Sequence, residues 1–120
     1  MNEQEKQLLL KDLCARLPYG IKVCYRLSDN DKPTTETLSG HMLDYFNENS
    51  IIEVKPYLRP MESMTREEEE TWEFLCSTCG YDINERYLED GIDWLHKKHL
   101  DYRNLIRRGL ALEAPKDMYK

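Results

Sequence analysis

The sequence predicts an α+β fold in a single domain, residues 1–120. Three observations support this prediction. Apolar residues recur at helical spacing near the N-terminus and in the last third of the chain, they alternate with polar residues in between, and turn formers separate these stretches. We expect an N-terminal helix, a three-stranded antiparallel meander and two to three C-terminal helices. The meander packs one face on helices or curls into a partial barrel.

The first predicted element is a helix over residues 2–16. Pro18 ends it, because proline disfavours helical geometry in the residue before it. The apolar stripe that we expect on this helix consists of Leu10, Leu13, Cys14 and Leu17, with Leu9 beside it.

The middle of the chain predicts three strands, over residues 20–27, 35–46 and 51–58. Apolar and polar residues alternate in the first strand, as in a half-buried strand. Gly40 in the second strand indicates a bulge. Pro56 cannot donate a ladder hydrogen bond, so we expect the third strand to lie at an edge or to end there.

Two longer helices are predicted in the last half of the chain. Thr65 and Glu68 form a capping-box pattern that begins a helix running to about Cys76, with Gly80 closing it. The second helix begins near Ile83 or near Asp90 and runs to about residue 100, since apolar residues recur at spacings of three and four. Its apolar stripe consists of Leu88, Ile92, Leu95, His99 and Tyr102.

A short turn over residues 104–108 follows this helix. Gly109 is well placed for the left-handed conformation that ends a helical turn. Leu110 and Leu112 then predict a short strand or a packed extended tail, which Pro115 ends.

Composition places the chain among ordinary soluble domains, with 40% apolar and 33% charged residues. The longest aliphatic run is Leu8 to Leu10, too short to cross a membrane. The N-terminus has no basic region followed by an apolar core, so we expect no signal peptide. Four cysteines without secretion are expected to be reduced thiols or metal ligands, and the predicted compartment is the cytosol.

The formal net charge of −6 is unevenly distributed along the chain. Residues 61–93 carry 2 basic and 11 acidic side chains, whereas residues 94–120 carry 7 basic and 3 acidic side chains. The simpler interpretation is an acidic helix beside a basic segment that offsets it. The alternative is a bipolar surface that steers a partner.

One set of residues has the composition of a metal site. Cys76 and Cys79 are followed, after sixteen residues, by His96 and His99, which supplies the ligands of a tetrahedral zinc site. The spacer is longer than in a typical zinc finger. In the alternative interpretation the cysteines only end a helix, His99 fills the core and His96 lies on the surface.

The sequence gives little support for catalysis. It contains neither a nucleophile elbow nor a glycine-rich phosphate loop. The two cysteines Cys76 and Cys79 are expected at a helix C-terminus, where the dipole does not acidify a thiol. His41 alternates with Leu43 and Tyr45, so we expect a half-buried core histidine rather than a general base.

Nucleic-acid binding would depend on the basic segment over residues 97–108, with aromatic residues interleaved. Such a segment can follow a phosphate backbone and stack bases. The overall acidity of the chain argues against this function, as do Trp94 and Tyr102, which are expected on or beside the buried face. The basic residues concerned are Lys97, Lys98, Arg103, Arg107 and Arg108.

Two stretches, KPYLRPMESMT (residues 55–65) and HLDYRNLIRRGLALEAP (residues 99–115), carry a family resemblance. Together with Pro18-Tyr19-Gly20 they resemble a family of short uncharacterised proteins from gut Bacteroidales and their phages and prophages. The resemblance implies a phage or mobile-element context and no assigned activity. We expect a functional surface within these stretches, formed by Lys55, Arg59, His99, Asp101, Tyr102 and Arg103.

These observations favour a small non-enzymatic interaction or accessory protein with an unidentified protein partner. The alternative is a regulatory module that is stabilised by one zinc ion at Cys76, Cys79, His96 and His99, or that binds nucleic acid through residues 97–108. An enzyme is the third possibility, because no residue set combines a catalytic spacing with a suitable environment.

Overall fold

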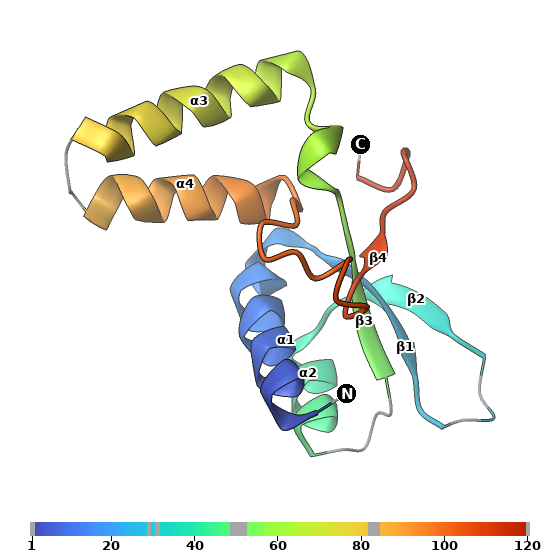
Figure 1. Ribbon diagram of the computed structural model, residues 1–120. Helices are drawn as coiled ribbons and strands as arrows, with labels where there is room; N and C mark the ends of the chain where they lie inside the picture. The colour runs from blue at the N-terminus through green and yellow to red at the C-terminus, as the bar shows by residue number, and fades with distance from the viewer. Residues whose placement is uncertain (1, 29, 31, 49–52, 82–84, 120) are drawn as a thin grey trace.

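The computed structural model describes residues 2–28, 30, 32–48, 53–81 and 85–119, and only the course of the backbone for residues 76–81 and 85–90. Helices and strands are both present, which confirms the α+β class (Figure 1). The helices are α1 (Glu3–Arg16), α2 (Gly40–Asn47), α3 (Arg66–Tyr81) and α4 (Glu85–Lys97), with short 3₁₀ turns η1 (Leu17–Tyr19) and η2 (Met61–Ser63). The strands are β1 (Lys22–Arg26), β2 (Thr34–Thr37), β3 (Glu53–Leu58) and β4 (Leu112–Glu113).

The four strands form an open sheet with the order β2-β1-β3-β4. β1 is antiparallel to both β2 and β3, whereas the short β4 is parallel to β3. The predicted three-stranded meander is therefore wrong in detail, because β2 and β3 are not neighbours. Pro56 lies in β3 and pairs with Val23 of β1. The two β3 residues that pair with β4 are Tyr57 and Leu58, so Pro56 has no partner in β4.

The predicted strand over residues 35–46 is wrong beyond Thr37, because α2 occupies its second half. The side chain of Ser39 accepts a hydrogen bond from the amide of Met42 at 3.4 Å and caps this helix. Met42, Leu43 and Phe46 pack on the core at helical spacing. α2 carries the chain from one side of β1 to the other, which explains the strand order.

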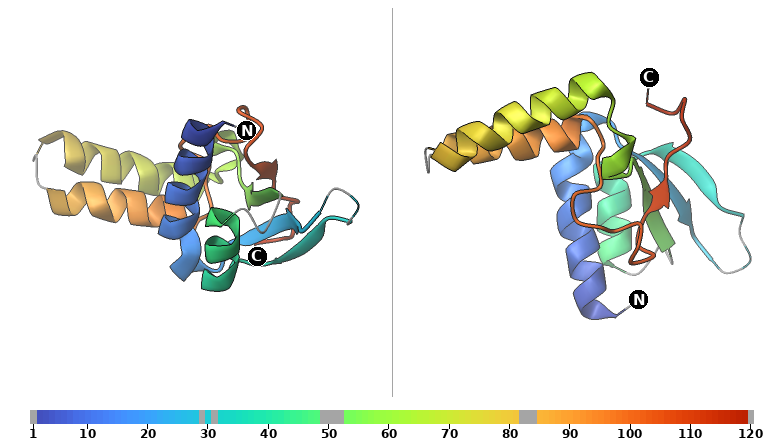
Figure 2. Two further views of the ribbon diagram at one scale, coloured as in Figure 1. Left: turned by 90° about the horizontal axis from the view of Figure 1, so that it is seen from below. Right: turned by 45° about the horizontal axis from the view of Figure 1, so that its top comes forward.

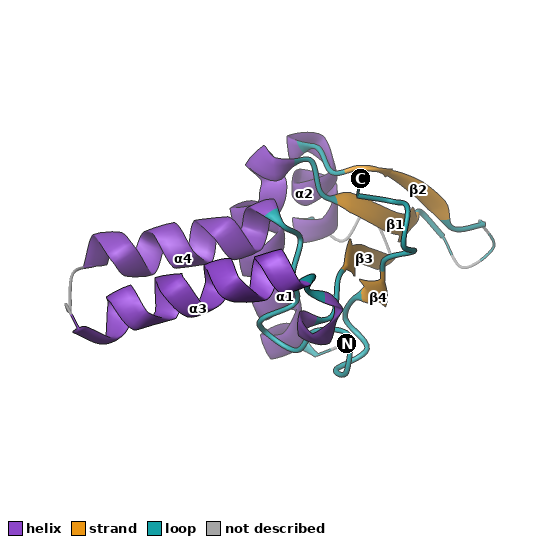
Figure 3. Ribbon diagram, turned by 90° about the horizontal axis from the view of Figure 1, so that it is seen from above, coloured by secondary structure: helices purple, strands orange, loops and turns teal. Residues whose placement is uncertain are grey.

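α1 and α2 cover one face of the sheet (Figures 1 and 3). Leu9 and Leu13 from α1 are fully buried against Val23 and Leu58, and each such side chain contributes about 1.5–3 kcal/mol to folding. Among the described helices none covers the opposite face (Figure 3). Arg26, Glu53 and Lys55 form ion pairs on that face, at 2.7 and 3.1 Å.

α3 and α4 form an antiparallel hairpin that projects from the rest of the molecule (Figures 1 and 2). Thr65 and Glu68 exchange hydrogen bonds at 2.9 and 3.2 Å, which confirms the predicted capping box. α3 runs on to Tyr81, so the predicted closure by Gly80 is wrong. Trp72 and Trp94 stack between the two helices with ring centroids 6.0 Å apart. The predicted start of the second helix near residue 83 lies outside the described residues.

α4 ends in a turn whose left-handed residue is His99, with φ of 59°. The amide of Leu100 donates to the carbonyl of Leu95, and that of His99 to the carbonyl of His96, both at 3.0 Å. This is the helix-ending arrangement in which glycine usually occupies the left-handed position. The predicted helical stripe through His99 and Tyr102 is therefore wrong, because the helix ends at residue 97.

The second such turn involves Gly109, as predicted, with φ of 76°. The short strand predicted after it is β4. No helix in the described part of the chain is long and apolar enough to span a membrane.

Candidate functional site

Arg59 joins three segments that are distant in the sequence. Its guanidinium donates to both carboxylate oxygens of Glu68 at 2.7 and 2.9 Å, and to the carbonyls of Ser63 and Lys98 at 3.2 and 3.3 Å. Its backbone accepts from the amide of Asp101 and donates to the carbonyl of His99, both at 2.8 Å. Arg59 therefore fixes the end of β3 to the start of α3 and to the end of α4.

The ion pair between Arg59 and Glu68 is only partly exposed to solvent, with side-chain accessibilities of 21% and 13%. Hydrogen bonding from Arg59 lowers the pKa of Glu68 to about 2. A two-pronged guanidinium–carboxylate contact is geometrically more specific than a contact with lysine.

His99 and Tyr119 stack beside this ion pair, with ring centroids 3.8 Å apart. The Tyr119 hydroxyl donates to the carbonyl of Tyr57 at 2.7 Å and accepts from the amide of Lys22 at 3.0 Å. Burial lowers the pKa of His99 to about 4 and raises the pKa of Tyr119 to about 12. Both rings are therefore neutral at pH 7.

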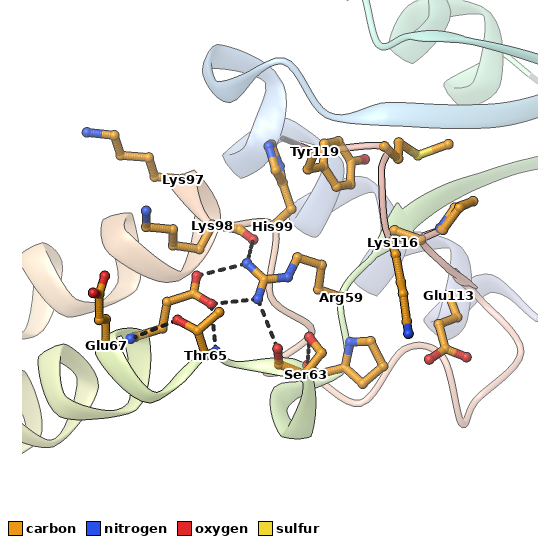
Figure 4. Close-up of a pocket in the computed structure, with 15 residues that line it drawn as sticks. Arg59, Ser63, Thr65, Glu67, Lys97, Lys98, His99, Glu113, Lys116 and Tyr119 are labelled. Carbon is orange, nitrogen blue, oxygen red and sulfur yellow. Dashed lines mark hydrogen bonds and ion pairs between the residues drawn. The ribbon is translucent and has the colours of Figure 1, made fainter.

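These residues belong to an open groove of about 980 Å³, which we call the Arg59 groove (Figure 4). One wall comes from the start of α3 and the turn before it, a second from the end of α4, and a third from the C-terminal segment. The lining consists of Arg59, Pro60, Ser63, Thr65, Glu67, Glu68, Lys97, Lys98, His99, residues 113–116, Met118 and Tyr119.

Among the described residues, three lysine ammonium groups line the groove in addition to the guanidinium of Arg59. Lys97 and Lys98 extend from the end of α4, and Lys116 comes from the C-terminal segment (Figure 4). None of the three forms an ion pair with a described residue. The described carboxylates of the lining are those of Glu67, Glu68 and Glu113, and Glu68 forms an ion pair with Arg59.

A second polar cluster lies in the interior, around Arg16. Arg16 and Asp12 are both 0% exposed and form an ion pair at 2.8 Å on successive turns of α1. Arg16 also donates to the carbonyl of Leu100 at 2.8 Å, and Arg103 lies 3.0 Å from the second Asp12 oxygen. This Arg16 cluster ties α1 to the turn that follows α4.

Tyr102 and His96 complete the Arg16 cluster. Arg103 donates to the Tyr102 hydroxyl at 2.9 Å, and a hydrogen bond of 2.7 Å joins that hydroxyl to His96 Nε2. Burial, reinforced by the charge of Arg16, lowers the pKa of His96. A neutral imidazole that carries its proton on Nδ1 accepts at Nε2, and in that tautomer the Tyr102 hydroxyl donates to His96.

The structure divides the six residues of the predicted interaction surface among three places. Arg59 and His99 line the Arg59 groove, whereas Lys55 pairs with Glu53 on the uncovered face of the sheet. Asp101 is buried and accepts from the amides of Leu105 and Ile106 at 2.8 and 3.0 Å, so it fixes a turn. Tyr102 and Arg103 belong to the Arg16 cluster.

The cysteines of the predicted zinc site, Cys76 and Cys79, have side chains outside the described residues, so the proposed convergence of four ligands stays a prediction. His96 is 4% exposed and bonded to Tyr102, and His99 stacks on Tyr119. The alternative that placed His96 on the surface is therefore wrong. The third histidine, His41, is exposed on α2 rather than half-buried.

The basic residues at positions 97–108 have different surroundings. Lys97 and Lys98 line the Arg59 groove, whereas Arg108 borders a separate hollow beside the start of α1. Arg103 is held by Asp12 and Tyr102. Trp94 stacks on Trp72.

Sequence reasoning missed the buried charges of α1 and the C-terminal wall of the groove. The sequence does contain a signal for the buried charges. One helix face carries Leu9, Asp12, Leu13 and Arg16, at spacings of three and one, and on this face the acid Asp12 lies four residues before the base Arg16. Tyr119 lacks any comparable signal, because its partners are far away in the sequence.

Comparisons with protein-family models, with curated proteins and with solved structures found no match to this chain. The geometry of the two clusters is therefore the basis for the functional argument.

Proposed function

We propose that this chain is a non-enzymatic interaction protein that holds a segment of a protein partner in the Arg59 groove. The observation that carries the proposal is the groove itself, about 980 Å³, with three lysines that form no ion pair with a described residue. Small-molecule sites are mostly apolar and enclose their ligand. This groove is open and its lining is rich in charges, which suits a polypeptide better than a small molecule.

The construction of the groove supports the same proposal. Arg59 makes six hydrogen bonds that fix β3, the start of α3 and the end of α4. A surface that is rigid before binding loses little conformational freedom when a partner docks. His99, the imidazole beside Arg59, has a pKa of about 4, so it stays uncharged at pH 7 and suits a contact role better than proton transfer.

The proposed setting is the cytosol of a phage-carrying bacterium. The support for it comes from the sequence: the stretches at residues 55–65 and 99–115, which include Arg59 and the turn at His99, resemble proteins of Bacteroidales and their phages.

Site-specific photo-crosslinking in an extract of such a bacterium tests the proposal. A benzophenone amino acid replaces Lys98 in one variant and Lys116 in another, and Lys32, an exposed residue between β1 and β2, in the control. We expect the same partner to be captured from positions 98 and 116 and not from position 32. Adducts that are identical at all three positions, or none from either groove position, would overturn the proposal.

A further inference from the structure

We infer that the segment held in the Arg59 groove is acidic and extended, and that its carboxylates pair with Lys97, Lys98 and Lys116. This inference depends on the proposed function and adds the chemistry of the partner. It follows from the charge that is left over once the groove's own ion pair is formed.

Arg59 and Glu68 neutralise each other, because both carboxylate oxygens accept from the guanidinium. Among the described residues of the lining, the remaining ionised side chains are the three lysines, Glu67 and Glu113, which is three positive against two negative charges. Glu67 lies in the first turn of α3, where the helix dipole stabilises a negative charge. The groove therefore carries an excess of positive charge in a chain whose formal net charge is −6.

The lysines lie on two different walls. Lys97 and Lys98 end α4, whereas Lys116 lies in the C-terminal segment, with the stacked rings of His99 and Tyr119 in the same lining (Figure 4). A single small anion would contact one wall. A chain that crosses the groove in an extended conformation presents carboxylates to both walls, and it can place an apolar group on Pro115 or Met118, which also line the groove.

The acidity of the rest of the molecule adds selectivity. Long-range repulsion from a net charge of −6 weakens the binding of an acidic segment elsewhere on the surface, whereas the lysines of the groove attract it locally. Exposed pairs each contribute little, so at least two simultaneous contacts are needed for measurable affinity.

Nuclear magnetic resonance titration of the ¹⁵N-labelled full chain tests the inference. The probe is a short peptide in which glutamate alternates with glycine and serine, and the comparison probes are the lysine equivalent and inorganic phosphate. We expect the glutamate peptide to shift the amide signals of residues 97–100 and 116–119, and the other two probes to leave them in place. Equal shifts with phosphate would mean a small-anion site, and shifts confined to other parts of the chain would also overturn the inference.

Charge reversal provides the matched control. The groove variant K97E/K98E/K116E and the control variant K11E/K32E/R107E, whose positions are exposed and outside the groove, change the net charge equally. We expect the groove variant to bind the glutamate peptide at least about tenfold more weakly than the control variant does. Equal losses would show non-specific attraction and would overturn the inference.

The two proposals can fail separately. Crosslinking from positions 98 and 116 without any binding of the glutamate peptide would refute the acidic chemistry and leave the docking function in place. Absence of both would refute both.

Discussion

Two arginines hold the same turn at the end of α4, but in different environments. Arg16 is 0% exposed and donates to the carbonyl of Leu100, whereas the Arg59 side chain is 21% exposed and donates to the carbonyl of Lys98. At the centre of the Arg16 cluster, the ion pair between Arg16 and Asp12 is fully buried. The Arg59 cluster borders an open groove with lysines available for a partner. The comparison teaches that similar ion-pair chemistry can fix a core or frame an open groove, which we propose as a binding surface, depending on solvent access.

The largest expected effect comes from breaking the buried pair. Arg16→Met leaves Asp12 buried with only Arg103 as a partner, and we expect it to lower the free energy of unfolding by about 3–5 kcal/mol. Arg59→Met should cost only about 1–2 kcal/mol, because Glu68 can then be hydrated. Urea denaturation of both variants measures this difference. Equal losses would contradict the distinction between a core cluster and a surface cluster.

The second expected effect is a loss of stability in mild acid. The pKa of His99 is lowered to about 4 in the folded protein, so between pH 6.5 and pH 4 the unfolded chain binds more protons. The contribution of His99 to the free energy of unfolding should therefore be at its maximum above pH 6.5. It should decrease as the pH falls towards 4, by at most about 1.4 kcal/mol per pH unit for one group.

His99→Asn is the matched variant for the pH experiment, since asparagine tolerates the left-handed backbone of this position. It should show a shallower pH dependence than the wild type when urea midpoints are compared at several pH values. The remaining slope is expected from His96, whose pKa is also lowered, and at the acid end of the range from Glu68, whose pKa is about 2 in the folded protein. An unchanged slope would mean that His99 does not contribute.

A smaller effect is expected from Glu68→Gln, which keeps the capping pattern of α3 but removes the charge opposite Arg59. We expect a loss of about 1 kcal/mol in the free energy of unfolding. Glu69→Gln, at the exposed neighbouring position, should be nearly neutral. The urea midpoints of the two variants measure this difference. A loss of similar size in both would show that the ion pair between Arg59 and Glu68 does not stabilise the groove.

The smallest effect on stability is expected at the lysines. Lys98→Gln removes a charge that forms no ion pair with a described residue, so its free energy of unfolding should stay within about 0.5 kcal/mol of the wild type. Its affinity for the glutamate peptide should nevertheless decrease, as measured by the same titration. A marked destabilisation would show that Lys98 has a structural role.

Local signals in the sequence predicted the elements with a strong chemical signature. The capping box at Thr65 and Glu68, the left-handed Gly109 and the N-terminal helix depend on interactions within a few residues of each other. The sequence prediction missed α2, although Met42, Leu43 and Phe46 recur at helical spacing, because Gly40 was interpreted as a bulge within a strand. Ser39, which caps it, is a weak signal on its own.

The candidate site was harder to predict, because its parts meet only through the fold. Arg59 and His99 were both expected at a functional surface, and both line the groove. Their partners Glu68 and Tyr119 were not, since the pairing depends on where α3 begins and on how the last residues return to β1 and β3. Tyr102 and Arg103 had the same appearance in the sequence as Arg59, yet their contacts with Arg16 and Asp12 of α1 place them in the other cluster.

The central claim is that a partner binds at the Arg59 groove and leaves the Arg16 cluster untouched. Hydrogen–deuterium exchange of the full chain, alone and in the complex isolated after crosslinking, tests it most directly. We predict slower exchange in peptides that cover residues 59–68, 97–100 and 113–119, and no change in those that cover residues 12–16 and 22–37. Slower exchange confined to the uncovered face of the sheet, with the groove unchanged, would contradict the claim.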